Sequence, residues 1–219
     1  MYCYITSTSS HVYQNNIEIK PSFSLIGNIK QDINKGKYST FMEKEIHEQP
    51  LLIDKLINNY LPKDNILFSS SIKYNLLNSD KIYLVACGSS FYASKIGKIY
   101  LQKYLKNDVE VLLASEALYA FPLLSKNPYF IFASQSGETL DVLNLVKICK
   151  KKNIKTLGLV NSYSSSLERM CDDSINVLAG KEISVASTKA FFNQCLIYLF
   201  LSKINNTKSL KSDLFFVKK

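Results

Sequence analysis

A cluster of hydroxyl-bearing residues carries the clearest chemical signal in this sequence. Ser134, Ser136 and Thr139 lie on either side of Gly137 in the stretch SQSGET, residues 134–139. Hydroxyl groups donate hydrogen bonds without bringing a formal charge, and glycine permits a tight turn and the close approach of a ligand to the backbone. The cluster therefore predicts a site for an anion such as phosphate.

The cluster lies between a predicted strand and a predicted helix. Residues 129–133 form an apolar run, and residues 140–147 have the hydrophobic spacing of a helix. The start of a helix leaves backbone N–H groups without partners, and the helix dipole favours negative charge there. A simpler interpretation stays open at this point: Ser136 or Thr139 caps the helix and nothing binds.

Short apolar runs alternate with helical segments over much of the chain. Five runs are predicted to be strands: 82–86, 109–114, 129–133, 156–160 and 174–178. Longer helices are expected at about 91–105, 139–152 and 187–203, and Ser165 with Glu168 forms a capping box before a short helix. This alternation predicts β-α-β crossovers and a five-stranded parallel sheet that is covered on both faces.

Open parallel sheets bind ligands outside the carboxyl ends of their strands. This rule places Gly88, Ser89 and Ser90, which follow the first of these strands, at the same edge as residues 134–139. The loop 184–189, before the last helix, is a candidate third member. All three segments are rich in hydroxyls at a helix start, which favours a ligand site more strongly than any one of them.

Composition and charge pattern indicate which classes of partner to expect. The chain of 219 residues carries a net charge of +9, but its lysines are spread along it and no nucleic-acid-binding module is recognisable. No uncharged apolar run approaches the roughly 18 residues of a membrane span, and the N-terminus lacks the pattern of a secretory signal. A cytoplasmic protein without nucleic-acid or membrane partners is expected.

The sequence offers little for a metal ion. Five cysteines are widely separated with no CxxC pair, and His11 and His47 are the only histidines. Neither a metal site nor a cofactor is expected.

The first 36 residues are polar and irregular, with strand-like pieces at 2–5 and 23–26, so they are either disordered or packed as an arm. A helix is expected to begin near Ser39, and Pro50 allows a kink or a second helix after it.

Four strings in the chain occur together in one known family: FMEKEIHEQP (41–50), ACGSS (86–90), SQSGET (134–139) and EISVASTKAF (182–191). Residues from about 35 to about 201 closely resemble the first sugar-isomerase (SIS) domain of the glucosamine-6-phosphate synthases, the isomerizing glutamine–fructose-6-phosphate aminotransferases. The resemblance implies an α/β protein with a three-layer α/β/α, flavodoxin-like fold. It also implies a SIS domain at 37–205, between an N-terminal extension at 1–36 and a C-terminal tail at 206–219.

The resemblance further implies a hexose 6-phosphate ligand, fructose 6-phosphate or glucosamine 6-phosphate, and specific contacts to it. The phosphate is expected on hydroxyls of the SQSGET and ACGSS strings, with Gln135 contributing through its backbone or amide, and Val185 and Ser187 are expected to approach the sugar. Ser89 stands where the family often has threonine, and Gly88 and Gly137 support the turns. The implied substrate-binding residues are Ser89, Ser90, Ser134, Gln135, Ser136, Thr139, Val185 and Ser187.

The resemblance leaves parts of the synthase unaccounted for. Neither a glutaminase domain nor a second SIS domain is recognisable in the chain, and the second SIS domain supplies most isomerase acid/base groups in this family. Glu138, Glu182 and Lys189 are candidates for proton transfer, but each is better explained by a structural role, so no catalytic residue is assigned.

Three hypotheses follow from this. The chain is an aminotransferase fragment whose partner chain carries the second SIS domain, a stand-alone sensor of hexose phosphates, or an inactive remnant that associates with a full-length synthase. A homodimer is expected because SIS domains usually pair.

Overall fold

The structure, a computed structural model, describes residues 2–20 and 34–218. The chain divides into two compact units, Met1–Asn34 and Lys35–Lys219. Each unit is described separately below.

The first unit is a small antiparallel sheet. Its three strands are consecutive in the chain, β1 (Tyr2–Ile5), β2 (Ser10–Gln14) and β3 (Ile17–Ile19). Tyr2 and Tyr13, which are paired across β1 and β2, stack with ring centroids 5.1 Å apart. Sequence patterns predicted β1 but neither β2 nor β3, and the strand-like piece at 23–26 lies outside the described residues.

The second unit is built on a five-stranded sheet. Its strands are β4 (Lys81–Ala86), β5 (Asp108–Leu113), β6 (Pro128–Ser134), β7 (Lys155–Val160) and β8 (Asp173–Asn176). They lie in the order β5-β4-β6-β7-β8, and every neighbouring pair is parallel. The predicted five-stranded parallel sheet is confirmed.

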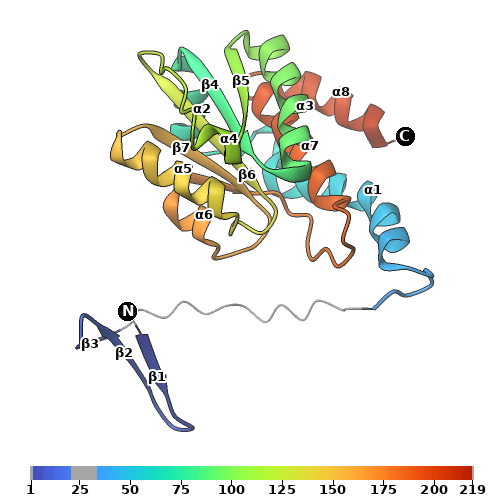
Figure 1. Ribbon diagram of the computed structural model, residues 1–219. Coiled ribbons are helices and arrows are strands. Elements are labelled where there is room, and N and C mark those ends of the chain that lie inside the picture. The colour runs from blue at the N-terminus through green and yellow to red at the C-terminus, as the bar shows by residue number, and fades with distance from the viewer. Residues whose placement is uncertain (1, 21–33, 219) are drawn as a thin grey trace. The chain divides into compact units, whose positions relative to one another are not determined.

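Helices cover both faces of this sheet, which makes three layers (Figure 1). One face carries α1 (Phe41–Tyr60), α2 (Ser70–Asn78), α3 (Gly88–Leu105), α7 (Lys189–Ser202) and α8 (Thr207–Lys218). The other carries α4 (Ala114–Ala117), α5 (Leu140–Lys151) and α6 (Ser166–Met170). A short 3₁₀ helix, η1 (Pro62–Asp64), follows α1. The α/β/α fold class is thereby confirmed.

The core follows from strand geometry. Successive side chains of a strand point to opposite faces of a sheet. In β4, Ile82 and Leu84 pack into the cluster under α1, α3 and α7, whereas Tyr83 and Val85 pack into the cluster under α5. A strand that is buried on both faces reads as a continuous apolar run, which is why the strands were visible in the sequence.

Several helices differ from the predicted ones. Helix α1 continues through Pro50 as one helix, and the Thr40 hydroxyl caps it by accepting a hydrogen bond from the Glu43 N–H at 3.1 Å. Helix α3 begins at Gly88, so Gly88 to Ser90 form its first turn and not a preceding loop. Helices α2 and α8 were not predicted.

Helices α3 and α7 pack unusually closely at Gly97. A Cβ atom on Gly97 would lie 2.5 Å from Cγ of Tyr198, whose side chain is fully buried. The Tyr198 hydroxyl is 2.9 Å from that of Ser94. The Tyr198 ring therefore leaves room only for glycine at position 97 of α3.

Helix α8 closes the core on the α7 side. Leu210 and Leu214 are buried in the main apolar cluster. The Lys203 ammonium, only 3% exposed, donates to the Ser209 hydroxyl at 2.5 Å and pairs with the Asp213 carboxylate. Residues 206–219 therefore include a packed helix.

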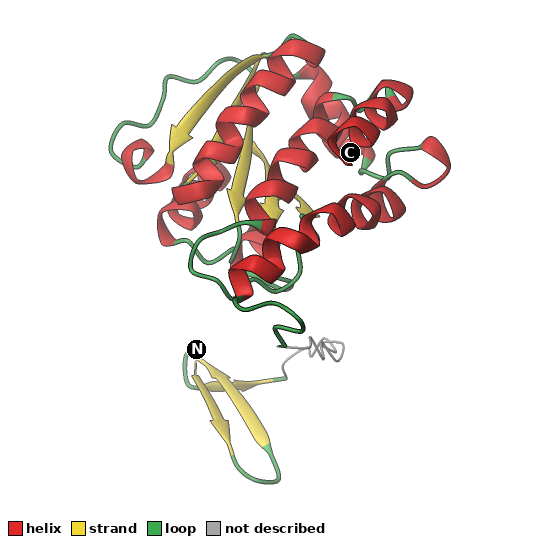
Figure 2. Ribbon diagram, turned by 90° about the vertical axis from the view of Figure 1, so that its right-hand side faces the viewer, coloured by secondary structure: helices red, strands yellow, loops and turns green. Residues whose placement is uncertain are grey.

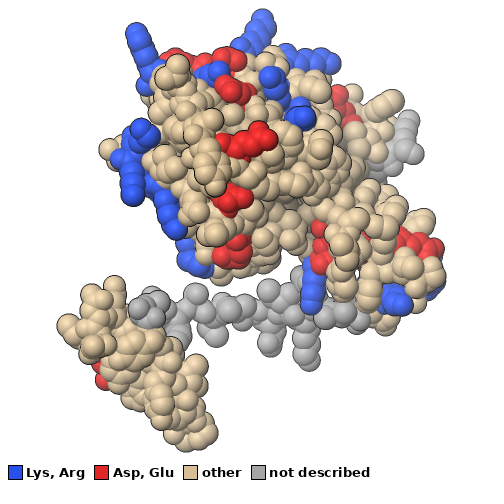
Figure 3. All heavy atoms as spheres, in the orientation of Figure 1, with Lys and Arg blue, Asp and Glu red and all other residues tan. Residues whose placement is uncertain are grey.

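Charge is dispersed on the face of the second unit seen in Figure 3. Lys and Arg lie along one flank and the top, with Asp and Glu on the surface between them. In the described parts of the chain, no helix combines the length and apolar character that crossing a lipid bilayer requires.

Candidate functional site

The strand order creates a switch point at the carboxyl edge of the sheet. From β4 the chain moves to β5 on one side, and β6, β7 and β8 then follow on the other side of β4. Parallel sheets bind ligands in the crevice where the strand order reverses. Here the strand order reverses between β4 and β6, so this rule predicts a ligand near their carboxyl ends. In Figure 2 the strand arrows run toward the edge where the loops that follow the strands emerge.

Strand register brings two of the predicted loops together. Ala86 at the end of β4 pairs with Ala133 of β6. The next residues, Cys87 and Ser134, therefore lie side by side where β4 and β6 end. The first turn of α3 and residues 134–139, hereafter the hydroxyl turn, lie at the same point of the sheet, as the sequence predicted.

Hydrogen bonds order the hydroxyl turn internally. The Ser134 and Thr139 hydroxyl oxygens are 2.9 Å apart. The Gly137 N–H donates to Ser134 Oγ and the Glu138 N–H to Ser136 Oγ, both at 3.1 Å. These two amides therefore already have acceptors within the turn.

Thr139 stands at the N-cap position of α5, but its side chain makes no capping hydrogen bond. Its hydroxyl instead faces that of Ser134. The hydroxyl of Ser136 accepts from Glu138, which precedes the helix. The simple capping interpretation therefore does not describe either side chain.

Gly137 is required for the shape of the turn. Its φ is +69°, a conformation that disfavours residues with a Cβ. A Cβ here would also lie 2.3 Å from the Ser165 hydroxyl oxygen and 2.7 Å from Val160 Cγ2. The Gly137 carbonyl accepts from the Leu167 N–H at 3.0 Å, which fastens the turn to α6.

The predicted phosphate contacts differ in exposure. Ser89 and Ser136 are exposed, and Thr139 is half-buried. Ser90 and Ser134 are buried, at 6% and 3% exposure. Ser89 and Ser136 are thus accessible to a ligand at the surface, whereas Ser90 and Ser134 lie deeper.

Asn161, which sequence reasoning missed, links the hydroxyl turn to Ala179 and Gly180, which precede the third predicted segment, 184–189. The Asn161 N–H donates to the Gln135 carbonyl at 3.2 Å. Its side chain donates to the Gly180 carbonyl at 2.7 Å and accepts from the Ala179 N–H at 2.9 Å. Because Asn161 directly follows β7, it connects the end of β6 with the chain that leaves β8.

Val185 and Ser187 lie farther along, in the loop 181–188. The Val185 side chain is fully exposed. The Ser187 hydroxyl donates to Glu182 at 3.2 Å, and the same carboxylate accepts from the N–H groups of Thr188 and Lys189 at 2.6 and 2.8 Å. Glu182 therefore caps the start of α7.

The other two candidates for proton transfer, Glu138 and Lys189, also make hydrogen bonds that hold the fold together. Glu138 is exposed and accepts from the Ser166 N–H at 2.7 Å, a hydrogen bond that lowers the pKa of its carboxyl below the ordinary value. The Lys189 ammonium is buried, donating to Glu48 and to the Lys181 carbonyl, each at 2.8 Å. These contacts favour structural roles for both residues.

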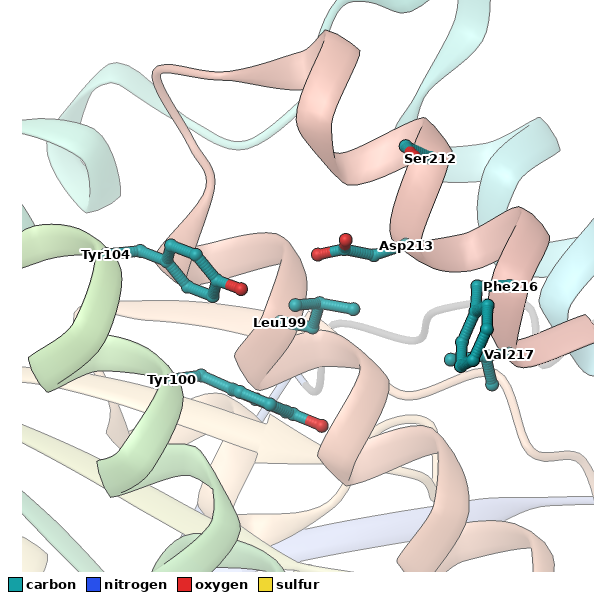
Figure 4. A pocket seen from close by; sticks show the side chains of 7 residues that line it. All are labelled: Tyr100, Tyr104, Leu199, Ser212, Asp213, Phe216 and Val217. Carbon is teal, nitrogen blue, oxygen red and sulfur yellow. The ribbon is translucent and has the colours of Figure 1, made fainter.

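A separate hollow of about 380 Å³ lies at the other end of α3. Figure 4 shows the phenol rings of Tyr100 and Tyr104 facing Asp213 and Phe216 of α8 across it. Tyr100 and Tyr104 are in the last turns of α3, so this hollow is not part of the hydroxyl turn. Among the described residues, no group of three or more His, Cys, Asp or Glu side chains could hold a metal ion.

Comparison with known proteins identifies the family of this chain. The SIS domain profile matches residues 75–203, which is more than half of the chain and spans β4 to α7. The chain belongs to the SIS domain family. The hydroxyl turn, the first turn of α3 and the loop 181–188 all fall within the matched segment.

Within this family, the chain is similar to aminotransferases. Glutamine–fructose-6-phosphate aminotransferase (isomerizing) of Halalkalibacterium halodurans is 42% identical over 172 residues, covering 78% of this chain and 29% of that protein. The enzyme of the same name from Shouchella clausii is 39% identical over 203 residues, covering 87% and 33%. This SIS domain thus spans about a third of the length of these relatives.

Solved structures agree with the fold. The C-terminal domain of glucosamine-fructose-6-phosphate aminotransferase from Francisella tularensis superposes with a TM-score of 0.75 at 31% identity, covering 84% of this chain and 55% of that one. A glucosamine-6-phosphate deaminase from Thermotoga maritima has a TM-score of 0.66 at 23% identity, covering 81% and 53%, and supports the fold alone. The predicted resemblance to an aminotransferase SIS domain is confirmed.

Proposed function

We propose that this SIS domain binds a hexose 6-phosphate, fructose 6-phosphate or glucosamine 6-phosphate, and forms the phosphate-holding half of a glucosamine-6-phosphate synthase isomerase site. The hydroxyls of the hydroxyl turn and of Ser89 and Ser90 receive the phosphate, and Val185 and Ser187 face the sugar. The remaining half of the site comes from a second SIS domain or a second copy of the chain.

The observation that carries this proposal is the pairing of the Ser134 and Thr139 hydroxyls, 2.9 Å apart, at the switch point of the sheet. A helix start whose threonine does not cap it leaves room for an anion to complete that turn. The aminotransferase relatives are consistent with a phosphorylated sugar as this anion.

Fructose 6-phosphate is expected to bind at least tenfold more tightly than fructose. Hydrogen bonds to a charged group contribute roughly 1.5–3 kcal/mol each, and several converge on the phosphate. Isothermal titration calorimetry with fructose 6-phosphate, fructose and inorganic phosphate measures the difference. Equal affinities for fructose and its 6-phosphate would exclude phosphate as the main determinant of binding.

Ser136→Ala is expected to weaken fructose 6-phosphate binding about tenfold, the equivalent of one hydrogen bond of about 1.4 kcal/mol to a charged ligand. Because Ser136 is exposed, the free energy of unfolding should change by less than about 1 kcal/mol. Ser212→Ala, an exposed serine on α8, is the matched control and should bind as the unmodified protein does. An unchanged affinity in Ser136→Ala would contradict the assigned site.

A second function, the sensing of hexose phosphates without catalysis, is favoured by one observation. The three candidates for proton transfer all hold backbone or ion-pair contacts: Glu138, Glu182 and Lys189. Assays of hexose 6-phosphate isomerisation by the chain alone, and by the chain mixed with a second SIS domain, separate the two functions. Activity that appears only in the mixture supports the half-site, and binding without activity in either supports the sensor.

A further inference from the structure

A buried carboxylate on α1 holds the loop 181–188 from outside it. Glu45 is 3% exposed, and its Oε1 accepts from the Ile183 N–H at 2.6 Å and the Ser184 N–H at 3.3 Å. Its Oε2 accepts from the Ser184 hydroxyl. Burial raises the pKa of this carboxyl, but the hydrogen bonds from Ile183 and Ser184 outweigh it, and the pKa lies below the ordinary value.

The loop is fastened on both sides of its exposed residue. Glu45 fixes Ile183 and Ser184, and Glu182 fixes Thr188 at the start of α7. Val185 lies in the chain between the residues held by these two carboxylates, and its side chain is fully exposed to solvent. An apolar side chain is thus displayed on backbone that is fixed on either side of it.

Simple attachment of α1 to the sheet does not need this arrangement. Removing a carboxylate from water is unfavourable unless donors compensate it, and Ile53 and Leu56 already attach α1 through apolar packing. What the carboxylate adds is orientation, because its hydrogen bonds fix the direction of two peptide N–H groups directly before Val185.

We propose that Glu45 is a positioning residue that holds Ile183 and Ser184 so that Val185 and Ser187 meet the sugar of a bound hexose 6-phosphate. This inference rests on the function proposed above and assigns a separate task to each part of the site. The hydroxyl turn binds the phosphate, and the loop held by Glu45 distinguishes a sugar phosphate from phosphate alone.

The test compares two ligands in matched variants. Glu45→Gln keeps the size of the side chain but replaces one acceptor oxygen with an amide group that donates. Glu43→Gln is the control, because Glu43 is on the same helix and its carboxylate binds Ser39 N–H and hydroxyl at 3.0 and 2.6 Å, away from the loop. Fructose 6-phosphate and inorganic phosphate are titrated into each by calorimetry.

In Glu45→Gln, we expect about a tenfold loss of affinity for fructose 6-phosphate and a change of less than twofold for inorganic phosphate. Glu43→Gln should match the unmodified protein with both ligands. Ser184→Ala removes one donor to Glu45 without changing charge, and should produce a smaller loss of the same kind. If circular dichroism shows that Glu45→Gln does not fold, the affinities of Ser184→Ala for the two ligands serve as the test instead.

The outcomes separate the two proposals. If the unmodified protein binds both ligands and neither Glu45→Gln nor Ser184→Ala changes the ratio of their affinities, the positioning role is wrong while the phosphate site stands. If both ligands weaken equally, Glu45 supports only the fold. If the unmodified protein binds neither ligand, the proposed function fails and the inference fails with it.

Discussion

Gly137→Ala is expected to lower the free energy of unfolding by about 4 kcal/mol and to abolish detectable binding of fructose 6-phosphate. A left-handed conformation costs a non-glycine residue roughly 1–2 kcal/mol, and overpacking a rigid site costs roughly 1–3 kcal/mol more. Both apply here, since φ is +69° and the new methyl group would lie 2.3 Å from the Ser165 hydroxyl oxygen. Urea unfolding followed by circular dichroism measures the stability, and calorimetry measures the binding.

Gly36→Ala separates the two costs. Gly36 has a φ of +61°, close to that of Gly137, but nothing lies within 4 Å of the position its Cβ would take. This variant should therefore lose only the backbone contribution, about 1–2 kcal/mol, and should bind fructose 6-phosphate normally. Equal losses of stability in the two variants would show that the approach of Ser165 to the turn does not matter.

Gly97→Ala is expected to destabilise the chain by about 2–3 kcal/mol, although alanine is the better helix former. In an ordinary helix interior this substitution stabilises by roughly 0.5–1 kcal/mol. At Gly97 the added methyl group would lie 2.5 Å from the ring of Tyr198, which is fully buried between α7 and α3. The ring must move, and its hydrogen bond to Ser94 weakens with it.

A double substitution tests this contact directly. Tyr198→Leu provides space beside α3 at the cost of its own buried contacts. If the contact between the added methyl group and the Tyr198 ring causes the destabilisation, the two substitutions should not be additive. The double variant Gly97→Ala/Tyr198→Leu should then lose at least about 0.5 kcal/mol less unfolding free energy than the two single variants lose together. Chemical denaturation of the four proteins supplies the comparison, and a stabilised Gly97→Ala would overturn the packing argument.

The sheet could be predicted because each strand carries its own signal. Runs such as Ile82 to Ala86 are buried on both faces, so their apolar character does not depend on knowing the neighbours. Helices α2 and α8 carry weaker signals, with only Ile72 and Leu76 buried in α2 and Leu210 and Leu214 in α8. Two buried residues make only a short apolar stripe, and helix propensity alone does not decide whether a helix forms.

The candidate site was predictable where it is local in sequence. Whether the Thr139 hydroxyl caps α5 or pairs with Ser134 could not be read from the sequence, because both use the same residue types at the same positions. Asn161 and Glu45 were not predictable, because each acts on a segment distant along the chain: Gly180 for Asn161, and Ile183 for Glu45. A polar residue at the end of a strand or inside a helix gives no hint of such a partner.

Helix α8 determines where this SIS unit can be cut. A chain shortened at residue 205 would lose Asp213 and Ser209, and the Lys203 ammonium would then lie at the protein surface with neither partner. The same cut would remove Leu210 and Leu214 and uncover the apolar groups beneath them. Such a fragment should aggregate at concentrations where the whole unit stays dispersed, because newly exposed apolar patches promote self-association. We therefore expect a stably folded fragment of this unit to include α8.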